Sequence, residues 1–296
     1  MEDEPQSSPE AAEACAMALK AAEGDEAPQN WAAALDHLER AAQLGSLLAR
    51  AQLMGLSREW RLAHDILAEK TDQEWSWQQV RKSIDLKRWL EPSPKAIPTK
   101  ESRMAVVQDI AEPELCDWVI ARARPILEPA KVYHRVESKG YLSDKRTNSY
   151  CALAGSDRDV IMAILRARII EATGTQGHRF ERPHVLHYLV GQEFRPHYDI
   201  ILDPALPDLA QRFAAGGERA MTFLLSLNNE YEGGETAFPA IGMRWRGRKG
   251  SALFFWNVQP DGALDRRMLH AGLPLTGGEK WMLSQWIRSR VLPDNA

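Results

Sequence analysis

The most constraining feature of this chain is the triplet His197-Tyr198-Asp199, which is followed much later by His270. In a strand, residues two apart point to the same face, so His197 and Asp199 are expected to hold one metal ion together. His270 would reach the same ion from a distant strand. Two histidines and one carboxylate on one face are typical of non-haem iron oxygenases, because they leave positions on the metal for a chelating co-substrate and O2. The pattern therefore predicts a catalytic metal site rather than a structural one.

Three blocks of sequence around these residues carry a family resemblance. They are YLVGQEFRPHYD at 188–199, GGETAFP at 233–239 and HAGLPLTGGEKW at 270–281. In this order and at these separations they resemble the prolyl 4-hydroxylase branch of the iron(II)/2-oxoglutarate dioxygenases. The resemblance covers roughly residues 100–290 and is sharpest over 184–288.

The resemblance implies a set of cofactors and the residues that bind them. Fe(II) would be held by the two histidines and Asp199, with 2-oxoglutarate chelating the iron and O2 as the oxidant. Lys280 follows His270 by ten residues, a spacing suited to a salt bridge with the distal carboxylate of 2-oxoglutarate. Tyr188 and Thr222 are expected to add hydroxyl contacts. Ascorbate is the expected reductant.

The stretch 280–288 has the composition of a strand. A period of two places Lys280, Ser284 and Trp286 on one face, which we expect to be the inside of a barrel. His184 and His187, in the strand before the first ligand, are expected to pack or to support the site rather than to bind metal.

The resemblance also implies a reaction. Oxidative decarboxylation of 2-oxoglutarate to succinate and CO2 would be coupled to hydroxylation of an unactivated C–H bond, for which metal and co-substrate supply the difficult chemistry. Related halogenases replace the carboxylate ligand to make room for chloride. Because Asp199 is present, halogenation is disfavoured.

The substrate favoured by the resemblance is a prolyl residue in a peptide or protein. Arg219 and Trp286 match positions that face substrate in this branch, whereas Phe194 stands where relatives often carry a tyrosine. A free amino acid or another small molecule is the alternative substrate, and a binding module without turnover is a remote one. An open channel across the metal would favour a peptide. A pocket closed by a lid-like helical insertion over 204–217 would favour a metabolite.

The fold expected for the catalytic part is a double-stranded β-helix, the jelly-roll form, in a chain of the α+β class. Helices over 112–123 and 156–172 are expected to brace one of its sheets. A strand is expected at 104–108, and the remaining strands are predicted at 184–190, 194–200, 220–228, 235–238, 251–257, 267–270 and 280–288.

The N-terminal part has a different pattern, with apolar residues at helical spacing over 9–69. Asn30 is the predicted N-cap of one helix and Gly45 its predicted stop, and two more helices are expected over 46–56 and 58–69. The stretch 34–45 resembles a tetratricopeptide or SEL-type helical repeat. The predicted organisation is a small all-α cap at 1–90, a proline-rich linker at 91–102 and the dioxygenase domain at 103–292. The cap is expected to support the fold, to mediate dimerisation or to recruit a protein partner.

Composition narrows the setting in which such an enzyme would work. A net charge of −4 without a basic stripe argues against nucleic acid as the main partner. Three widely spaced cysteines suggest reduced thiols rather than a disulfide framework. No secretory leader and no membrane-spanning run is recognisable. The cytoplasm is the expected location.

Overall fold

The structure, a computed structural model, describes residues 8–24, 28–71, 73–91, 95–100, 103–132, 141–200 and 214–292. They group into two compact units. The first combines Met1–Ser93 with Gly155–Arg168, and the second combines Pro94–Ala154 with Ile169–Ala296. Most of the predicted lid over 204–217 lies outside the described residues.

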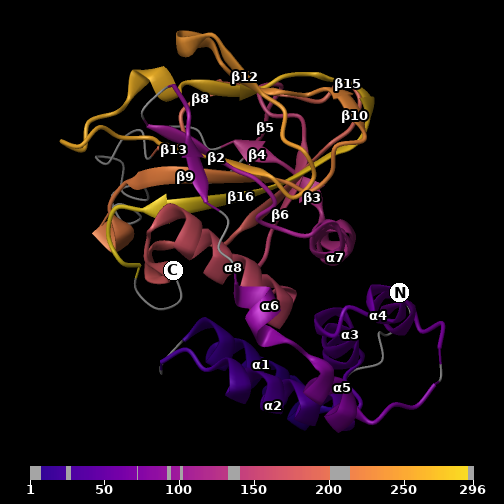
Figure 1. The fold of residues 1–296 in the computed structure, drawn as a ribbon. Coiled ribbons are helices and arrows are strands. Elements are labelled where there is room, and N and C mark those ends of the chain that lie inside the picture. The colour runs from indigo at the N-terminus through magenta and orange to yellow at the C-terminus, as the bar shows by residue number, and fades with distance from the viewer. Residues whose placement is uncertain are drawn as a thin grey trace. The chain divides into compact units, whose positions relative to one another are not determined.

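The first unit is helical (Figure 1). Its helices are α1 (Pro9–Glu23), α2 (Trp31–Gln43), α3 (Leu47–Leu56), α4 (Trp60–Leu67), α5 (Trp77–Ser83) and α6 (Leu86–Leu90). The first three begin at a side-chain oxygen that accepts a backbone N–H from the first turn, supplied by Ser8, Asn30 and Ser46. The predicted cap at Asn30 is therefore confirmed.

The first part of α8 (Val160–Thr173) also belongs to this unit. The backbone N–H of Val160 donates to Gln52 Oε1 at 2.9 Å, and Arg158 forms an ion pair of 2.9 Å with Glu23. The predicted domain boundaries place this stretch in the catalytic domain, whereas Gly155–Arg168 groups with the N-terminal helices. The resemblance to a helical repeat and a role in dimerisation or partner recruitment stay predictions.

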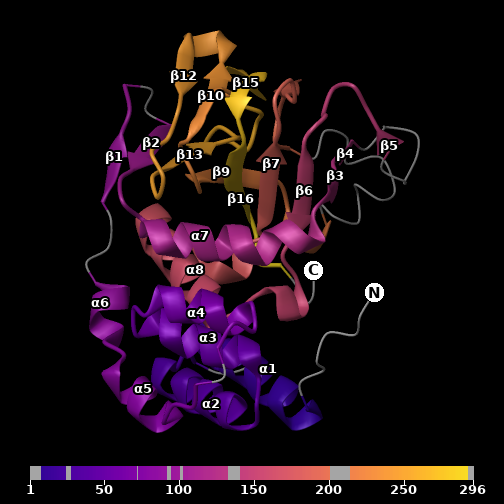
Figure 2. The ribbon, with the colours of Figure 1, turned by 90° about the vertical axis from the view of Figure 1, so that its right-hand side faces the viewer.

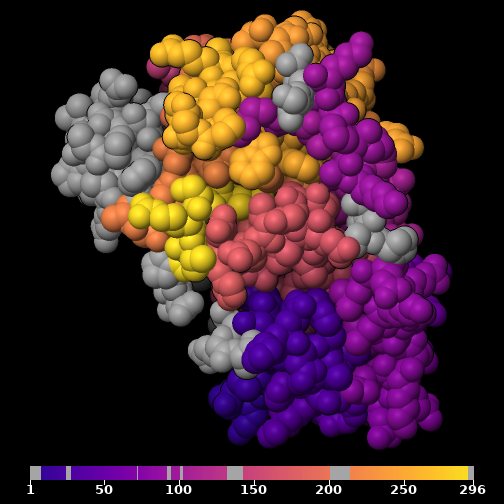
Figure 3. All heavy atoms as spheres, turned by 60° about the vertical axis from the view of Figure 1, so that its left-hand side comes forward, coloured from indigo at the N-terminus to yellow at the C-terminus, as the bar shows by residue number. Residues whose placement is uncertain are grey.

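The second unit contains a large antiparallel sheet of eight strands (Figure 2). In spatial order these are β1 (Ala96–Pro98), β2 (Met104–Val107), β13 (Ala252–Trp256), β9 (Arg219–Ser226), β16 (Lys280–Arg288), β7 (His184–Tyr188), β6 (Ser149–Ala152) and β3 (Glu128–Pro129). Strand β1 lies inside the predicted linker. In the space-filling view the purple residues of β1 and β2 lie beside orange residues from much later in the chain (Figure 3), in keeping with the pairing of β1 with β2 and of β2 with β13.

A smaller antiparallel sheet of four strands completes the jelly roll. Its spatial order is β12 (Met243–Trp245), β11 (Thr236–Phe238), β14 (His270–Gly272) and β8 (Phe194–His197), and two further pairs are formed by β10 (Tyr231–Gly233) with β15 (Leu275–Gly278) and β4 (Lys131–Val132) with β5 (Tyr141–Leu142). Apolar side chains of both sheets, among them Leu224, Phe238 and Phe255, form one core. The predicted α+β class with a jelly-roll catalytic unit and N-terminal helices is confirmed.

Strand β16 is the centre of this unit. All nine of its residues are buried, and it pairs with β9 on one side and β7 on the other. Its buried polar residues therefore need partners inside the protein or in a ligand, as Lys280 and Gln285 show. Helix α7 (Pro113–Ala123) packs against β9, where Cys116 Sγ lies 4.0 Å from the carbonyl oxygen of Ser226.

Two predicted strands extend further than the structure shows, one at its end and one at its beginning, and both differences affect the site. The strand predicted over 194–200 ends at His197, so Asp199 lies in the following bend. The strand predicted over 267–270 begins only at His270, because Arg266–Met268 forms a short 3-10 turn (η5) whose N–H at Arg267 is capped by Asp265. The other short 3-10 turns are Arg124–Ile126, Gly155–Asp157, Gly177–Arg179 and Pro239–Ile241. None of the helices that the structure describes is long and apolar enough to cross a membrane.

Candidate active site

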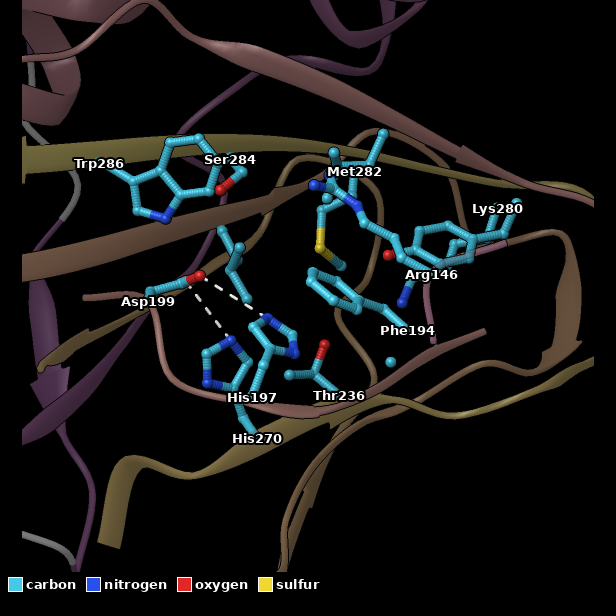
Figure 4. A pocket seen from close by; sticks show the side chains of 14 residues that line it. Arg146, Phe194, His197, Asp199, Thr236, His270, Lys280, Met282, Ser284 and Trp286 are labelled. Atoms are coloured by element: carbon cyan, nitrogen blue, oxygen red, sulfur yellow. Dashed lines mark ion pairs between the residues drawn. The ribbon is translucent and has the colours of Figure 1, made fainter. Parts of the chain in front are cut away.

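Strand pairing brings the two predicted histidine ligands together. In the antiparallel pair β8–β14, His197 lies directly opposite His270, and the two ring centroids are 4.3 Å apart. Asp199 turns back toward both rings (Figure 4), so that Oδ1 is 3.6 Å from His197 Nε2 and Oδ2 is 3.4 Å from His270 Nε2. One ligand atom from each residue lies within 4.8 Å of the others. The three predicted ligands therefore form one cluster.

The orientation of the two rings suits a metal ion. His197 Nδ1 is 2.8 Å from the carbonyl oxygen of Arg195, and His270 Nδ1 is 2.9 Å from that of Met268. A carbonyl oxygen only accepts, so in each neutral ring the hydrogen is on Nδ1 and Nε2 keeps its lone pair. Metal-binding histidines are commonly oriented in this way by a carbonyl behind them. Two lone pairs and a carboxylate thus converge, which is a donor set that fits a divalent cation.

Burial and mutual charge set the protonation of this cluster. Burial and the neighbouring His270 lower the pKa of His197 to about 3. Burial disfavours ionised Asp199, but the attraction of His270 and His197 outweighs it and holds the pKa of this carboxyl far below its usual range. For His270 the attraction of Asp199 likewise outweighs burial and raises the pKa. Without a metal ion, Asp199 thus favours a proton on the neighbouring His270. A metal ion bound to both residues would replace that proton.

Lys280 is the buried cation of the site. It stands opposite Tyr188 in the β16–β7 pair, with Nζ 5.1 Å from the centre of the tyrosine ring. The side chain is only 3% exposed, and burial lowers its pKa to about 8, although Glu235 acts in the opposite direction. Nζ donates a hydrogen bond of 2.6 Å to the carbonyl oxygen of Gly234, a residue at φ +67° where glycine is favoured. Among the described residues it forms no ion pair, so an anionic ligand would complete it.

One pocket joins the histidine–aspartate cluster to Lys280 (Figure 4). It encloses about 410 Å³, including its open mouth. Alternate residues of β16 form one wall, namely Lys280, Met282, Ser284 and Trp286. The predicted shared face of Lys280, Ser284 and Trp286 is therefore confirmed. The other side chains that line the pocket are Arg146, Leu186, Tyr188, Phe194, Leu224 and Thr236.

Comparison with known proteins identifies the family. Residues 183–288 match the 2OG-Fe(II) oxygenase superfamily. Probable prolyl 4-hydroxylase 3 of Arabidopsis thaliana is 32% identical over 206 residues, which are 63% of this chain and 69% of that protein. Probable prolyl 4-hydroxylase 10 of the same plant is 32% identical over 220 residues, covering 68% of this chain and 72% of its own length. The chain belongs to the prolyl 4-hydroxylase family.

Among solved structures, the chain is similar to the viral collagen prolyl hydroxylase of Paramecium Bursaria Chlorella virus-1 in its 2OG complex. The two share 25% identity with a TM-score of 0.49, and the match covers 64% of this chain and 97% of the viral one.

Membership in the prolyl 4-hydroxylase family makes the protein a 2-oxoglutarate-dependent dioxygenase that uses Fe(II) and O2. The residues present fit both bound groups, because the three donors converge at one end of the pocket, and the Lys280 ammonium, which has no ion pair among the described residues, stands at the other. When bound, Fe(II) and 2-oxoglutarate supply the oxidising power of the reaction. The chain itself holds and orients them and shields them from water.

Two residues predicted for this prolyl 4-hydroxylase site do not line the pocket. Thr222 is fully buried and donates a hydrogen bond of 2.9 Å to Asp199 Oδ2, from behind the carboxylate. Arg219 donates two hydrogen bonds of 2.8 Å to Glu181, and its guanidinium lies 3.8 Å from the ring centre of Trp286. The contacts predicted for Thr222 with 2-oxoglutarate and for Arg219 with substrate stay predictions, and no pocket position supports them.

The remaining predicted residues do line the pocket. Tyr188 is buried beside Lys280, and burial raises the pKa of its hydroxyl to about 12. Phe194 stacks on the ring of His197, with centroids 3.5 Å apart and an angle of 14° between the planes. Trp286 is 7% exposed, and among the described residues its buried indole Nε1 has no hydrogen-bond partner.

Among the pocket residues that were not predicted as site residues, Thr236 and Arg146 carry polar side chains and come from elements other than β16. Thr236 follows the Gly233-Gly234 turn as the first residue of β11, and the alternation of that strand could have indicated that it points inward. Arg146 comes from a polar loop, and its guanidinium lies 4.6 Å from the ring centre of Phe194. Nothing in the local sequence distinguishes Arg146 from a solvated arginine. Only the fold brings it to the pocket, where burial lowers its pKa.

Proposed function

We propose that this dioxygenase hydroxylates prolyl residues of a peptide or protein, with release of succinate and CO2 from 2-oxoglutarate. This proposal depends mainly on one observation. The histidine–aspartate cluster, Lys280 and the aromatic side chains of Phe194 and Trp286 all line the same pocket. The names of the curated relatives, probable prolyl 4-hydroxylases, support the same substrate class.

The arrangement divides the pocket by charge. Figure 4 places Lys280 and Trp286 at opposite ends of one row of side chains on β16, with the histidine–aspartate cluster beside it. An ammonium near one end suits the distal carboxylate of 2-oxoglutarate. The aromatic surfaces of Phe194 and Trp286 suit an apolar prolyl ring, which loses little conformational freedom on binding. Ring and metal cluster would then be neighbours.

Each residue has a defined part in this proposal. His197, Asp199 and His270 hold the iron, and Lys280 with the Tyr188 hydroxyl binds 2-oxoglutarate. Phe194, stacked on His197, keeps water from one side of the metal cluster. We expect ascorbate to sustain turnover by keeping the iron reduced.

A free amino acid is the second candidate substrate, and Arg146 is the observation that favours it. Its Nε donates to Asn148 Oδ1 at 3.2 Å, and its guanidinium lies against the rings of Phe194 and Tyr150. Among the described residues it forms no ion pair with a carboxylate. A substrate carboxylate close to the hydroxylated ring would supply one.

The deciding experiment measures succinate formed from 2-oxoglutarate with Fe(II), ascorbate and O2. Proline-containing peptides are compared with free proline and other free amino acids, and products are examined for a gain of about 16 Da, the mass of one oxygen atom. Stimulation by peptides with the added oxygen on proline supports the proposal. Stimulation by free amino acids alone would overturn it in favour of the second candidate.

Arg146→Gln sharpens the choice, with Arg146→Lys as the charge-retaining control. For a free amino acid the glutamine variant should raise the substrate KM by about 10-fold or more, because a charge-assisted hydrogen bond is worth about 1.5–3 kcal/mol. For a peptide bound through neutral groups the loss should be smaller. The KM of the Arg146→Gln variant for 2-oxoglutarate should be unchanged with either kind of substrate.

A further inference from the structure

A chain of two hydrogen bonds leads away from the metal cluster into the large sheet. Thr222 Oγ1 lies 2.9 Å from Asp199 Oδ2, and Asn257 Nδ2 lies 2.9 Å from Thr222 Oγ1. The three side chains are buried, and neither Thr222 nor Asn257 lines the pocket. The contact is therefore with the back of the carboxylate and leaves the pocket face of Asp199 clear.

The direction of both bonds is fixed by chemistry. An ionised carboxylate only accepts, so the hydroxyl of Thr222 must donate to Asp199. The amide nitrogen of Asn257 only donates, so it must use a lone pair of that same hydroxyl. The amide thus commits the hydroxyl proton to the carboxylate, and each bond strengthens the other.

The backbone holds this relay in place. Thr222 lies within β9, between Phe255 of β13 and Trp286 of β16. The N–H of Asn257 donates to the carbonyl oxygen of Ala220 at 2.8 Å. Asp199 itself lies in a bend after β8, and no strand that the structure describes pairs with it. A ligand outside the ladder needs another anchor, and the Thr222 hydroxyl supplies it.

We propose that Thr222 and Asn257 are positioning residues that fix the Asp199 carboxylate for the metal and thereby set the affinity of the site for a divalent cation. The inference rests on the proposed role of His197, Asp199 and His270 as metal ligands. It assigns Thr222 to the metal side of the site, in place of the predicted contact with 2-oxoglutarate.

The test measures metal affinity without substrate or turnover. Co(II), which is stable in air, is titrated into metal-free enzyme, and the dissociation constant is read from the visible absorption of the bound ion. Thr222→Val removes the hydroxyl with little change in shape and should weaken binding about 10–100-fold, the usual effect of losing a group that orients a metal ligand. Thr222→Ser keeps the hydroxyl and should bind within about threefold of the parent.

Asn257→Ala tests whether the amide acts through the hydroxyl. Alone it should weaken Co(II) binding by a smaller factor than Thr222→Val. Added to Thr222→Val it should produce no further loss, because its effect on Asp199 passes through the missing hydroxyl. Ser226→Ala, which removes another buried hydroxyl from β9, is the matched control and should leave the affinity unchanged.

Several results would overturn the proposal. One is a Thr222→Val enzyme that binds Co(II) as tightly as the parent while its KM for 2-oxoglutarate rises, since that would mean a cofactor contact. If the losses of Co(II) affinity in the double variant are additive, Asn257 does not act through the Thr222 hydroxyl, and that part of the proposal is wrong. Thermal unfolding of the metal-free variants shows whether they fold, and if Thr222→Val does not, Asn257→Ala with parental Co(II) affinity contradicts the proposal. Failure to hydroxylate any proline would leave these titrations unaffected, so the two proposals fail separately.

Discussion

Glu181 and Asp199 are both largely buried carboxylates of the catalytic unit, but their partners differ. Glu181 accepts two hydrogen bonds from Arg219 and another, of 3.0 Å, from Arg288. Burial would raise its pKa, but the two arginines outweigh burial and lower it to about 2. The negative charge of Glu181 is therefore compensated by arginines of the chain itself, without a ligand.

Asp199 has no such match. Its described neighbours are two imidazole nitrogens and one hydroxyl, so a neutral site would leave the carboxylate without a permanent cation. Lys280 presents the reverse case, a buried ammonium whose described acceptor is a main-chain carbonyl. Buried charge is costly unless it is paired. Matched clusters therefore indicate structure, whereas the two unmatched charges indicate where a cation and an anion bind.

Asp199→Ala tests the unmatched carboxylate and should have the largest effect. It removes one of three ligands, so we expect hydroxylation to fall below detection and Fe(II) affinity to collapse. Succinate formation and metal content measure the two effects. Near-normal turnover would contradict the assignment of the metal site.

Lys280→Met tests the unmatched cation. Loss of a charge-assisted bond worth about 1.5–3 kcal/mol should raise the KM for 2-oxoglutarate about 10–100-fold. The same change removes a buried ammonium, so the melting temperature at neutral pH should rise rather than fall. Lys280→Arg, which keeps the charge, is the comparison variant. A parental KM in Lys280→Met would show that the ammonium does not bind the co-substrate.

Glu181→Gln tests the matched cluster, and here the expected effect moves from activity to stability. Removing one member of a buried ionic network costs about 3–5 kcal/mol, because the opposite charge is left uncompensated. Chemical denaturation should show this loss. Co(II) affinity and the KM for 2-oxoglutarate should stay near parental values. A large loss of metal affinity in a folded variant would mean that the two clusters are coupled.

The sequence was sufficient for those parts of the site that depend on local period. The i and i+2 spacing of His197 and Asp199 and the alternation along β16 both follow from strand geometry, and the structure brings these residues to one pocket. The class of the fold followed in the same way, from short strands separated by turns. Strand ends were less accurate, because Asp265 caps a 3-10 turn where a strand was expected.

Contacts between distant segments were not predictable in this way. Thr222 meets Asp199 across 23 positions, and Arg219 meets Glu181 across 38, so both contacts depend on strand register rather than on spacing. The sequence alone does not show whether an arginine such as Arg219 contacts a substrate or forms an ion pair with an acidic residue of the protein. The position of Arg146 likewise depends on how its loop folds against Phe194.

The smallest predicted effect is a dependence on pH that separates ligand binding from folding. Burial lowers the pKa of Lys280 from 10.5 to about 8. The kcat/KM for 2-oxoglutarate should be constant just below that pH. Above it, kcat/KM should fall by up to tenfold per pH unit, because the ammonium deprotonates. Between about 8 and 10.5 the unfolded chain still carries this proton and the folded chain does not. The contribution of Lys280 to the free energy of unfolding therefore rises with pH, while co-substrate binding falls.

This opposition distinguishes the titration from ordinary alkaline unfolding, in which activity and stability fall together. The measurements are kcat/KM for 2-oxoglutarate and urea denaturation, both from pH 7 to 10. Lys280→Arg should remove the break near pH 8, because a guanidinium stays charged throughout this range. If the break persists in Lys280→Arg, another group controls co-substrate binding, and the charge of Lys280 is matched within the protein after all.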